Sequence, residues 1–311
     1  MRLSVAMATY NGADFVIEQL DSIMKQTMPV NEVIIRDDKS KDDTVERINQ
    51  YITENHFENI ISIKENDVNL GYASNFMEAL NNTTGDLIFF CDQDDKWPNN
   101  RIKEMTDLME KHSEIKLLAS EFSCFSDSDD ALSVPKWEIK KFKGDKSVEF
   151  IPFKASNIPI GAQGCTMCLR RTFYDEIKSY WFKGWAHDEF FWKLALCDDG
   201  LYMYHQPTIN RRLHANNVSL GKMRNHEKRI KFLKDLKKSH EATLKYALDK
   251  NIDKKNIKLL EKNIKATQLR IELMEDKKYF NTVKLILKYS NCYHKRRAIP
   301  VELKMALTYK K

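Results

Sequence analysis

The sequence predicts an α/β protein with a mostly parallel sheet flanked by helices, followed by an α-helical appendage at the C-terminal end. Two observations lead to this prediction. Short apolar runs alternate with helix-period apolar patterns over roughly the first 120 residues. Near residue 221 the glycines and aromatic residues become sparse, and lysine-rich helical patterning begins.

Five short apolar runs are interpreted as buried strands. Each is bounded by polar residues, which is typical of strands that are covered on both faces. The runs are Leu3–Ala8, Val33–Arg36, Ile60–Ile63, Leu87–Cys91 and Ile115–Ala119.

Four helices are expected between and after these strands, because apolar residues recur there at helical spacing. The second helix is expected to open with the cap-like pattern Ser40-x-x-Asp43. The stripes are Phe15, Leu20, Ile23 and Met24; Val45, Ile48 and Ile52; Ala73, Phe76, Met77 and Leu80; and, over 99–111 after Pro98, Ile102, Met105, Leu108 and Met109.

The charge divides the chain into two predicted domains, 1–221 and 222–311. The second holds 26 Lys and Arg against 10 Asp and Glu, whereas the first holds 25 against 35. Within the basic region, 226–249, 253–276 and 279–290 are expected to be amphipathic helices. Their apolar positions include Ile230, Leu233, Leu236, Leu259, Ile264 and Leu269. Such helices form either a solvated face or a platform for an anionic membrane surface.

Composition excludes several classes of protein. The chain has 311 residues, of which 42% are apolar and 31% charged, so collagen-like, disulfide-scaffold and disordered proteins are ruled out. No apolar run approaches the ~18–20 residues of a membrane-spanning helix, and no leader pattern opens the chain. We therefore expect a cytoplasmic protein with reduced cysteines. A lone Cys165-x-x-Cys168 is a weak indication of zinc.

Polar motifs follow three of the predicted strands: Thr9-Tyr10-Asn11-Gly12, Asp37-Asp38-Lys39-Ser40 and Asp92-Gln93-Asp94-Asp95. Ligands of parallel sheets bind beyond the carboxyl ends of the strands. The third motif crowds three carboxylates, which repel one another unless a cation neutralises them. Oxygen ligands favour Mg²⁺ or Mn²⁺.

Structural interpretations of both acidic motifs remain open. The third could be a solvated turn before the helix near Pro98, with Asp95 helping to cap that helix. In the second, a carboxylate could accept a hydrogen bond from a nucleobase imide, or Asp37 and Asp38 could serve turn chemistry alone.

The ordered set of motifs resembles the family 2 nucleotide-sugar glycosyltransferases, whose GT-A-type fold is Rossmann-like. The set consists of Ala8-Thr9-Tyr10-Asn11-Gly12, the segment from Asp37 to Thr44, Asn69-Leu70-Gly71 through Asn75, and the DXD-like run from Asp92 to Asp95. The resemblance covers about residues 1–220. It departs mildly at Ala8, where many relatives carry proline.

The resemblance implies roles for individual residues. Asp38 would contact the nucleobase, Asp92 the ribose or the metal shell, and Asp94 a divalent cation, Mn²⁺ or Mg²⁺, that bridges the diphosphate. His214 would be a further metal ligand or a phosphate contact. The implied substrate- and nucleotide-binding residues are Thr9, Tyr10, Asn11, Asp38, Asn69, Gly71, Asn75, Asp92, Gly164, Glu189 and Arg212.

Two further segments resemble a subgroup enriched in rhamnosyl and other surface-polysaccharide transferases. In Gly184–Trp192, Asp188 would be the catalytic base, with Glu189 as the competing candidate. In Arg211–Ser219, Arg212 could pair with the pyrophosphate. The segment Ile160–Thr166, with Gly164, either admits a sugar close to the backbone or is an ordinary strand entry.

These observations predict an inverting, metal-dependent glycosyltransferase of bacterial cell-surface polysaccharide synthesis. It would move a hexose or deoxyhexose, rhamnose among the candidates, from a UDP- or dTDP-linked donor to a glycan or lipid-linked glycan. Location at the inner face of the plasma membrane and homodimer formation stay open, whereas nucleic-acid motifs are absent. The alternatives are a sugar nucleotidyltransferase, whose glycine-rich basic signature is missing, and a non-catalytic scaffold.

Overall fold

The computed structural model describes the chain except residues 127–133, 135–138, 140–141, 215–224, 294–295 and 310–311. It comprises two compact units. The first contains Met1–Phe150, Ala162–Lys178 and Gly200–Leu220, and the second contains Ile151–Gly161, Ser179–Asp199 and Gly221–Lys311. The predicted domain boundary between residues 221 and 222 lies outside the described residues and stays a prediction.

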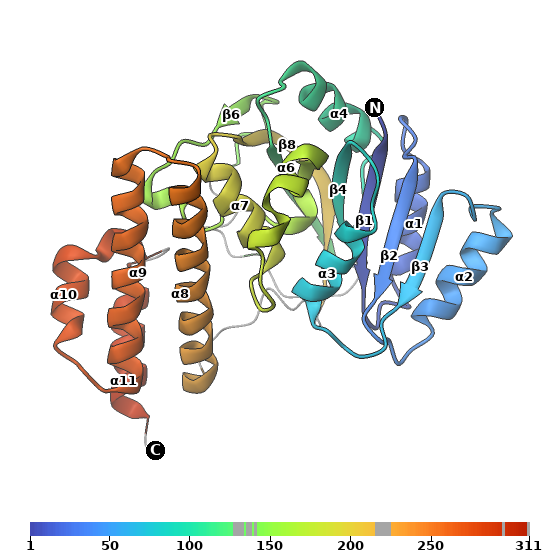
Figure 1. Cartoon of the computed structure of the whole chain (residues 1–311). Helices are drawn as coiled ribbons and strands as arrows, with labels where there is room; N and C mark the ends of the chain where they lie inside the picture. Colours follow the sequence, from blue (N-terminus) through green and yellow to red (C-terminus); the bar gives the residue numbers. More distant parts are fainter. Residues whose placement is uncertain (127–133, 135–138, 140–141, 215–224, 294–295, 310–311) are drawn as a thin grey trace. The chain divides into compact units, whose positions relative to one another are not determined.

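The first unit is built on a mixed eight-stranded sheet in the order β3-β2-β1-β4-β7-β5-β8-β6 (Figure 1). The strands β3, β2, β1 and β4 are parallel to one another, as are β5 and β8, whereas β7 and β6 run antiparallel to their neighbours. The predicted α/β class is confirmed. The bounds are β1 (Leu3–Thr9), β2 (Glu32–Asp37), β3 (Ile61–Glu65), β4 (Leu87–Asp92), β5 (Leu117–Ser126), β6 (Val148–Phe150), β7 (Cys168–Arg170) and β8 (Leu201–Leu213).

The last three strands were not predicted. β6 and β7 are three residues long, which is too short to show a periodic pattern. β8 is long, but the run His205-Gln206-Pro207 interrupts its apolar residues, and its pairing with β5 contains two register shifts. These three strands therefore depend on pairing with distant segments of the chain, which a local sequence pattern does not show.

Helices cover both faces of the sheet. α1 (Val16–Met24), α2 (Thr44–Glu54) and α4 (Arg101–Lys111) share one core with the β1 residues Leu3, Val5 and Met7. α3 (Tyr72–Asn81) contacts β1 and β2, and the ring of Phe76 lies 5.2 Å from that of Phe90 in β4. Because successive side chains of a strand alternate, Phe89 in the first core and Phe90 under α3 face opposite sides.

The predicted cap of α2 is wrong. The helix begins after Asp43, whose side chain makes no capping hydrogen bond. Ser40 instead donates its hydroxyl to Asp37, so it belongs to the turn that follows β2.

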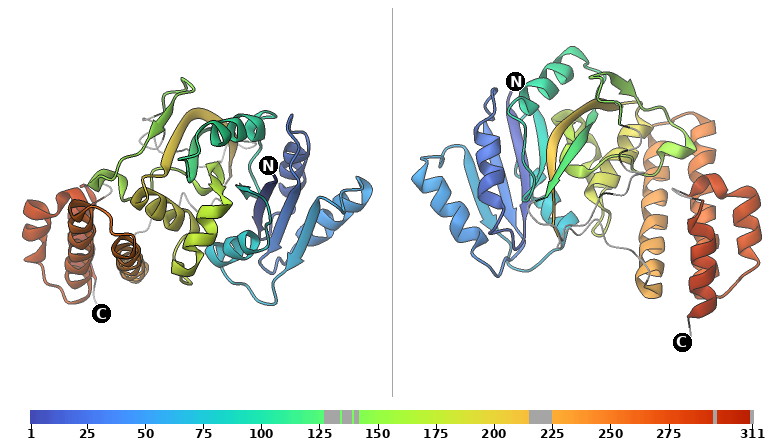
Figure 2. Two further views of the ribbon diagram at one scale, coloured as in Figure 1. Left: turned by 45° about the horizontal axis from the view of Figure 1, so that its top comes forward. Right: turned by 180° about the vertical axis from the view of Figure 1, so that it is seen from behind.

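The second unit contains five α-helices among its described residues. They are α7 (His187–Cys197), α8 (His226–Asp249), α9 (Lys254–Glu275), α10 (Asn281–Lys288) and α11 (Ala298–Thr308). α9 packs against α8, α10 and α11 (Figure 2). α11 was not predicted. Shorter helices are α6 (Arg171–Ile177) in the first unit and the 3-10 turns η1 (Ala155–Asn157), η2 (Gly164–Thr166), η3 (Lys178–Tyr180) and η5 (Ser290–Cys292).

Part of the apolar stripe predicted in the basic region lies inside the helical unit, whereas Leu236, Leu259 and Ile264 are only partly buried. Leu233 and Leu269 are buried in its core, and Ile230 packs against that core. The buried carboxylate of Glu302 in α11 ties three helices together. Arg270 and Arg229 donate to its Oε1 at 2.7 and 2.6 Å. Although burial opposes ionisation, these arginines hold the pKa of Glu302 below its ordinary value.

Candidate active site

Three polar motifs meet at one edge of the sheet, because β2, β1 and β4 are parallel neighbours. Thr9 pairs in register with Asp37, and Ala8 pairs with Asp92. The loops that follow these strands therefore lie side by side at the carboxyl ends, as the sequence predicts.

Asp37 organises the turn after β2. Its carboxylate accepts hydrogen bonds from the Thr9 hydroxyl at 2.8 Å and from the backbone N–H and hydroxyl of Ser40 at 2.8 and 2.6 Å. Both Asp37 and Thr9 are buried. Their partners therefore give the first carboxylate of the Asp37-Asp38 pair a structural role.

Asp38 holds the loop that carries Asn69 and Gly71. Its carboxylate is 2% exposed and accepts from the backbone N–H groups of Leu70 and Gly71 at 2.7 and 2.8 Å. Its backbone carbonyl accepts from Asn69 Nδ2 at 2.9 Å. An ionised carboxylate can accept about four hydrogen bonds, so Asp38 retains capacity for a further donor.

Asn66 was not identified from the sequence, yet it links two of the predicted residues. Its Nδ2 donates to Asp38 Oδ1 at 3.0 Å and to Asn75 Oδ1 at 2.8 Å. Asn75 is buried and donates to the carbonyl of Arg36 at 2.8 Å. Asn75 therefore braces strand ends, and no local pattern distinguishes Asn66 from an ordinary loop residue.

Gln93 connects the first and third motifs. Its Oε1 accepts from the Tyr10 N–H at 2.8 Å, and its Nε2 donates to the Tyr10 carbonyl at 3.0 Å. Asn11 is tied to the second motif, since its N–H donates to Ser40 Oγ and its Oδ1 accepts from Lys41 N–H, both at 2.8 Å. The Tyr10 side chain stays 42% exposed at this edge.

Replacing Gly12 by alanine is expected to destabilise the protein by about 1–2 kcal/mol, the contribution of two ordinary hydrogen bonds. An added Cβ would lie 2.2 Å from Gln93 Oε1, so Gln93 must move and release Tyr10. Denaturant unfolding of Gly12→Ala, Gln93→Ala and the double variant measures this. The effects should overlap in the double variant, and full additivity would contradict the link.

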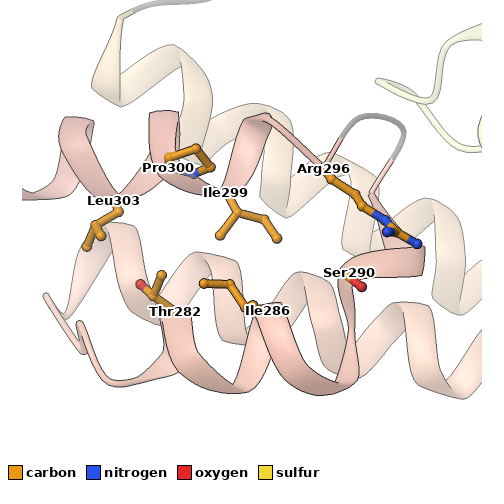
Figure 3. A pocket seen from close by; sticks show the side chains of 7 residues that line it. All are labelled: Thr282, Ile286, Ser290, Arg296, Ile299, Pro300 and Leu303. Carbon is orange, nitrogen blue, oxygen red and sulfur yellow. The ribbon is translucent and has the colours of Figure 1, made fainter.

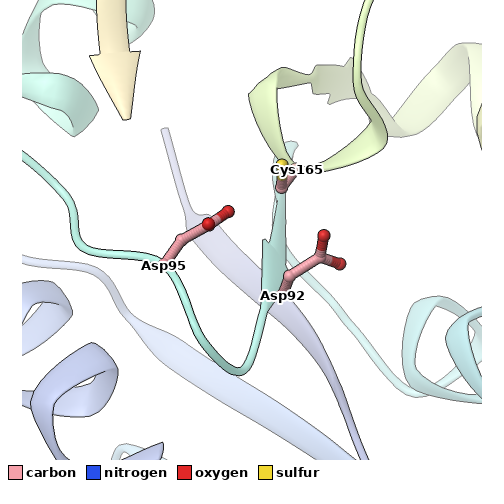
Figure 4. Close-up of side chains that lie close together, drawn as sticks. All are labelled: Asp92, Asp95 and Cys165. Carbon is pink, nitrogen blue, oxygen red and sulfur yellow. The ribbon is translucent and has the colours of Figure 1, made fainter. Parts of the chain in front are cut away.

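The third motif crowds carboxylates at the end of β4 (Figure 4). Oxygens of Asp92 and Asp95 and the Cys165 sulfur all lie within 4.8 Å of one another. Asp95 is 2% exposed; its Oδ1 accepts from the Arg212 N–H at 3.2 Å, while its Oδ2 has no hydrogen-bond partner in the described part of the chain. Burial, followed by the charges of Asp94 and Asp92, raises the pKa of Asp95.

The predicted capping role of Asp95 is wrong, because α4 begins after Asn100. The predicted metal ligands Asp94 and His214 are brought together: Asp94 Oδ2 lies 2.8 Å from His214 Nε2, and the imidazole stacks on Phe15 at 4.8 Å between ring centroids. The pair joins the DXD-like loop to the chain just after β8.

These residues fit a hard divalent cation. The carboxylates of Asp92 and Asp95 offer oxygen ligands close to each other, whereas Asp94 and His214 are not part of this group and face each other. A bound cation would favour the ionised form of Asp95, which burial and the charges of Asp94 and Asp92 disfavour. Cys165 does not suit such an ion, because burial keeps the pKa of its thiol far above the ordinary value. Gly164 begins the η2 turn that places Cys165 beside Asp95.

Arg212 braces the acidic loop from β8. Its Nε donates to the carbonyl of Asp94 at 3.0 Å, and its guanidinium forms an ion pair with Glu18 of α1. The guanidinium also lies over the rings of Phe15 and Phe125, at 5.2 and 4.6 Å from their centroids. Glu18 and Phe125 were not predicted as partners of Arg212, and Phe15 was predicted only as part of a helical stripe, because all three come from other parts of the chain.

Asp188 and Glu189, in the second unit, have different surroundings although they are adjacent. Asp188 lies in the first turn of α7, where its Oδ1 accepts from the Glu189 N–H at 2.7 Å. It has no ion-pair partner among the described residues, and burial raises its pKa to about 6. Glu189 forms an ion pair with Lys193 at 2.7 Å, whose side chain is 1% exposed.

Lys193 is fixed by residues of α8. Its Nζ donates to Ser239 Oγ at 2.8 Å and lies 3.1 Å from His240 Nδ1. Burial lowers the pKa of His240, so the imidazole is neutral at physiological pH and accepts from the ammonium group. Glu189 is thus committed to a buried ion pair, while Asp188 is not.

The fold and the acidic edge of the sheet identify the chain as a protein of the GT-A fold class. The chain belongs to glycosyl transferase family 2, whose family model matches residues 4–176. The first curated relatives that it matches are 29–35% identical over 97 to 126 residues, and the chain spans only 15–45% of their length.

One curated relative and two solved structures are similar to this chain. The dTDP-rhamnosyl transferase RfbG of Shigella flexneri is 27% identical over 68% of this chain and 72% of that protein. The structure of S. aureus TarS 1-349 with UDP-GlcNAc has a TM-score of 0.65 at 16% identity, covering 98% of this chain and 90% of that one. The mannosyltransferase PcManGT of Pyrobaculum calidifontis, in complex with GDP-Man and Mn²⁺, has a TM-score of 0.52 at 17% identity, covering 100% and 88%. The two structures share the fold.

Within the described residues, no helix combines the length and the apolar character that crossing a bilayer requires.

Proposed function

We propose that this chain is an inverting, metal-dependent glycosyltransferase that moves a hexose or deoxyhexose from a nucleoside-diphosphate sugar to a glycan of the bacterial cell surface. The observation that carries the proposal is the cluster of the Asp92 and Asp95 carboxylates at the end of β4, together with the Asp94–His214 pair; one buried oxygen of Asp95 has no hydrogen-bond partner among the described residues. Family membership supports the reaction class. The name of RfbG makes a dTDP-linked deoxyhexose such as rhamnose a natural candidate donor, beside UDP-linked sugars.

The donor side is assigned to the first unit. Asp38, with the loop of Asn69 and Gly71 that it holds, would bind the nucleobase through its remaining acceptor capacity. Exposed Tyr10 would contact the nucleoside. Asp92, Asp94 and His214 would hold Mn²⁺ or Mg²⁺, which neutralises the charge of the nucleoside diphosphate as it leaves. Arg212 would act mainly by fixing the Asp94 backbone.

Asp188 is proposed as the base that activates the acceptor. In a single displacement, the acceptor oxygen bonds to the anomeric carbon, the sugar–phosphate bond breaks, and the hydroxyl proton passes to Asp188. A pKa of about 6 leaves this carboxylate ionised at neutral pH and makes it more basic than an ordinary aspartate. Glu189 is less suited, because Lys193 neutralises its charge.

Thermal unfolding with UDP, dTDP, GDP and CDP, each with and without Mn²⁺, tests the proposal. One nucleotide is expected to raise the melting temperature by roughly 5 °C at 100 times its Kd, and only when the metal is present. Turnover of the matching nucleotide sugar would then be followed by release of the nucleoside diphosphate. Folded protein that responds to no nucleotide would contradict the proposal and favour a non-catalytic scaffold.

A further inference from the structure

The helices α10 and α11 carry an unusual share of exposed apolar side chains. Fifteen large apolar side chains are exposed among the described residues, and seven of them lie between Tyr279 and Leu307. Leu287 is 75% and Phe280 72% exposed. We call the following group the α10–α11 face: Phe280, Val283, Ile286, Leu287, Val301 and Leu307.

The apolar residues of the α10–α11 face are additional to those that hold the helices in place. In α10, Leu285 faces the core together with Asn281 and Thr282. Phe280, Val283 and Leu287 follow the spacing i, i+3, i+7 and so share an exposed side. In α11, Ile299, Glu302 and Ala306 are buried, whereas Val301 and Leu307 point outward.

A shallow groove of about 410 Å³ separates the two helices (Figure 3). Apolar side chains from both helices line it, and Arg296 stands at the end beside Ser290. The lining residues are Thr282, Ile286, Ser290, Arg296, Ile299, Pro300 and Leu303. An apolar surface with a cation at its edge suits an amphiphile better than a polar solute.

Positive charge is concentrated in the same segment. Residues 277–311 contain ten Lys and Arg and a single acidic residue, Glu302, which is buried and paired with arginines. Residues 226–276 are more balanced, with 14 basic against nine acidic residues. Lys284 and Lys288 are exposed on α10 next to Val283 and Leu287. The charge within this segment is therefore predominantly positive, although Asp276 and Glu272 pair with Lys278 at its start and Glu227 contacts Tyr309 at its end.

We propose that the α10–α11 face binds the surface of an anionic lipid bilayer. The apolar side chains would enter the headgroup region, while the flanking lysines and arginines contact lipid phosphates. A second copy of the chain fits less well, because pairing this face with itself would oppose like charges, and lysine is depleted at the centres of protein interfaces. The inference does not depend on the transferase activity.

Flotation with lipid vesicles tests this directly. The full chain is expected to float with phosphatidylcholine vesicles that contain about one third phosphatidylglycerol, and not with phosphatidylcholine alone. Raising the salt concentration should release it, since screening shortens the range of the attraction. Failure of the wild-type chain to float with the anionic vesicles would overturn the proposal.

Variants with two substitutions each separate the contribution of positive charge from that of the apolar side chains. Lys284→Gln with Lys288→Gln should weaken partitioning about 25-fold, because each lysine near an anionic surface contributes about a factor of five. Phe280→Ser with Leu287→Ser should abolish flotation, because it removes the two most exposed apolar side chains of the face. Lys254→Gln with Lys258→Gln, on α9 at the same spacing, is the matched control and should bind like the wild type. Unchanged binding of both test pairs would contradict the proposal.

Light scattering tests whether the α10–α11 face binds a second copy of the chain instead of a lipid surface. The proposal expects the same molecular mass for the wild type and for Phe280→Ser with Leu287→Ser. A wild-type dimer that these substitutions dissociate would assign the face to a second copy and overturn the lipid assignment. Nucleotide-dependent thermal shifts should be equal in all variants, which keeps this test separate from that of the donor site.

Discussion

Replacing Asp188 by asparagine is expected to lower turnover by about 10²–10⁴-fold, the range associated with loss of a positioned general base. Asparagine keeps the size of the side chain and its hydrogen bond to the Glu189 N–H but cannot accept the acceptor proton. The metal-dependent shift in melting temperature with nucleotide should persist, because the donor residues belong to other elements. The initial rate of nucleoside diphosphate release, at saturating donor and acceptor, measures the effect.

The pH dependence should identify the same group. Burial raises the pKa of Asp188 to about 6, so turnover should fall about tenfold for each pH unit below 6 and level off above 7. Because this pKa is that of the protein without substrate, the profile is measured as kcat/KM, with the acceptor well below its KM. A rate that stays constant between pH 5 and 7 would contradict the assignment.

The stability of the folded protein should fall as the pH rises, whereas turnover rises. The pKa of Asp188 in the folded protein exceeds its ordinary value of 3.8, so the protonated form favours folding, and this contribution is lost as the pH rises through about 6. At pH 8 the asparagine variant should therefore melt no lower than the wild type. This result would distinguish lost chemistry from lost folding.

Glu189→Gln provides the comparison. It leaves Lys193 without its ion-pair partner, and an uncompensated buried charge costs about 3–5 kcal/mol, so this variant should lose stability. If the folded fraction of Glu189→Gln lost turnover by about 10²-fold or more while Asp188→Asn stayed active, Glu189 would be the base.

Replacing Asp94 by asparagine is expected to remove both the metal-dependent thermal shift and turnover, the latter by about 10³-fold. The substitution halves the negative charge that Asp94 and Asp92 offer to a cation. It also leaves His214 next to a neutral amide in place of the carboxylate that lies 2.8 Å from its Nε2. Thermal shift with nucleotide over a range of Mn²⁺ concentrations, followed by a turnover assay, measures both effects.

Asp107→Asn is the matched control for this variant. Asp107 is an exposed aspartate of α4 whose carboxylate pairs with Lys103 one turn earlier. Because exposed pairs contribute about 0–1 kcal/mol, we expect the control to retain metal-dependent nucleotide binding. A full thermal shift in Asp94→Asn would show that the cation is held elsewhere.

Much of the first unit could be predicted from the sequence. The apolar runs of β1 to β5 and the apolar stripes of α1 to α4 are local patterns, because side-chain direction repeats every two residues in a strand and every 3.6 in a helix. The meeting of the motifs after β1, β2 and β4 could also be predicted, since it requires only that these strands be parallel neighbours. These elements depend on residues close together in the chain.

The partners of each site residue could not be predicted in this way. The two adjacent aspartates Asp37 and Asp38 look alike in the sequence, yet one holds Thr9 and the other holds Leu70 and Gly71. Asp188 and Glu189 differ because a buried lysine reaches only the second.

By itself, the sequence determined the α/β class, the order of the motifs and the basic character of the C-terminal region. The tertiary structure decided which carboxylates are already engaged and that Asp95 is buried with an oxygen that has no partner among the described residues. It also decided that most exposed apolar side chains of the helical unit lie between Tyr279 and Leu307, beside Phe232 and Leu248 of α8. Periodicity is a property of neighbouring residues, whereas burial and hydrogen-bond partners depend on segments far apart in the chain, which packing alone brings together.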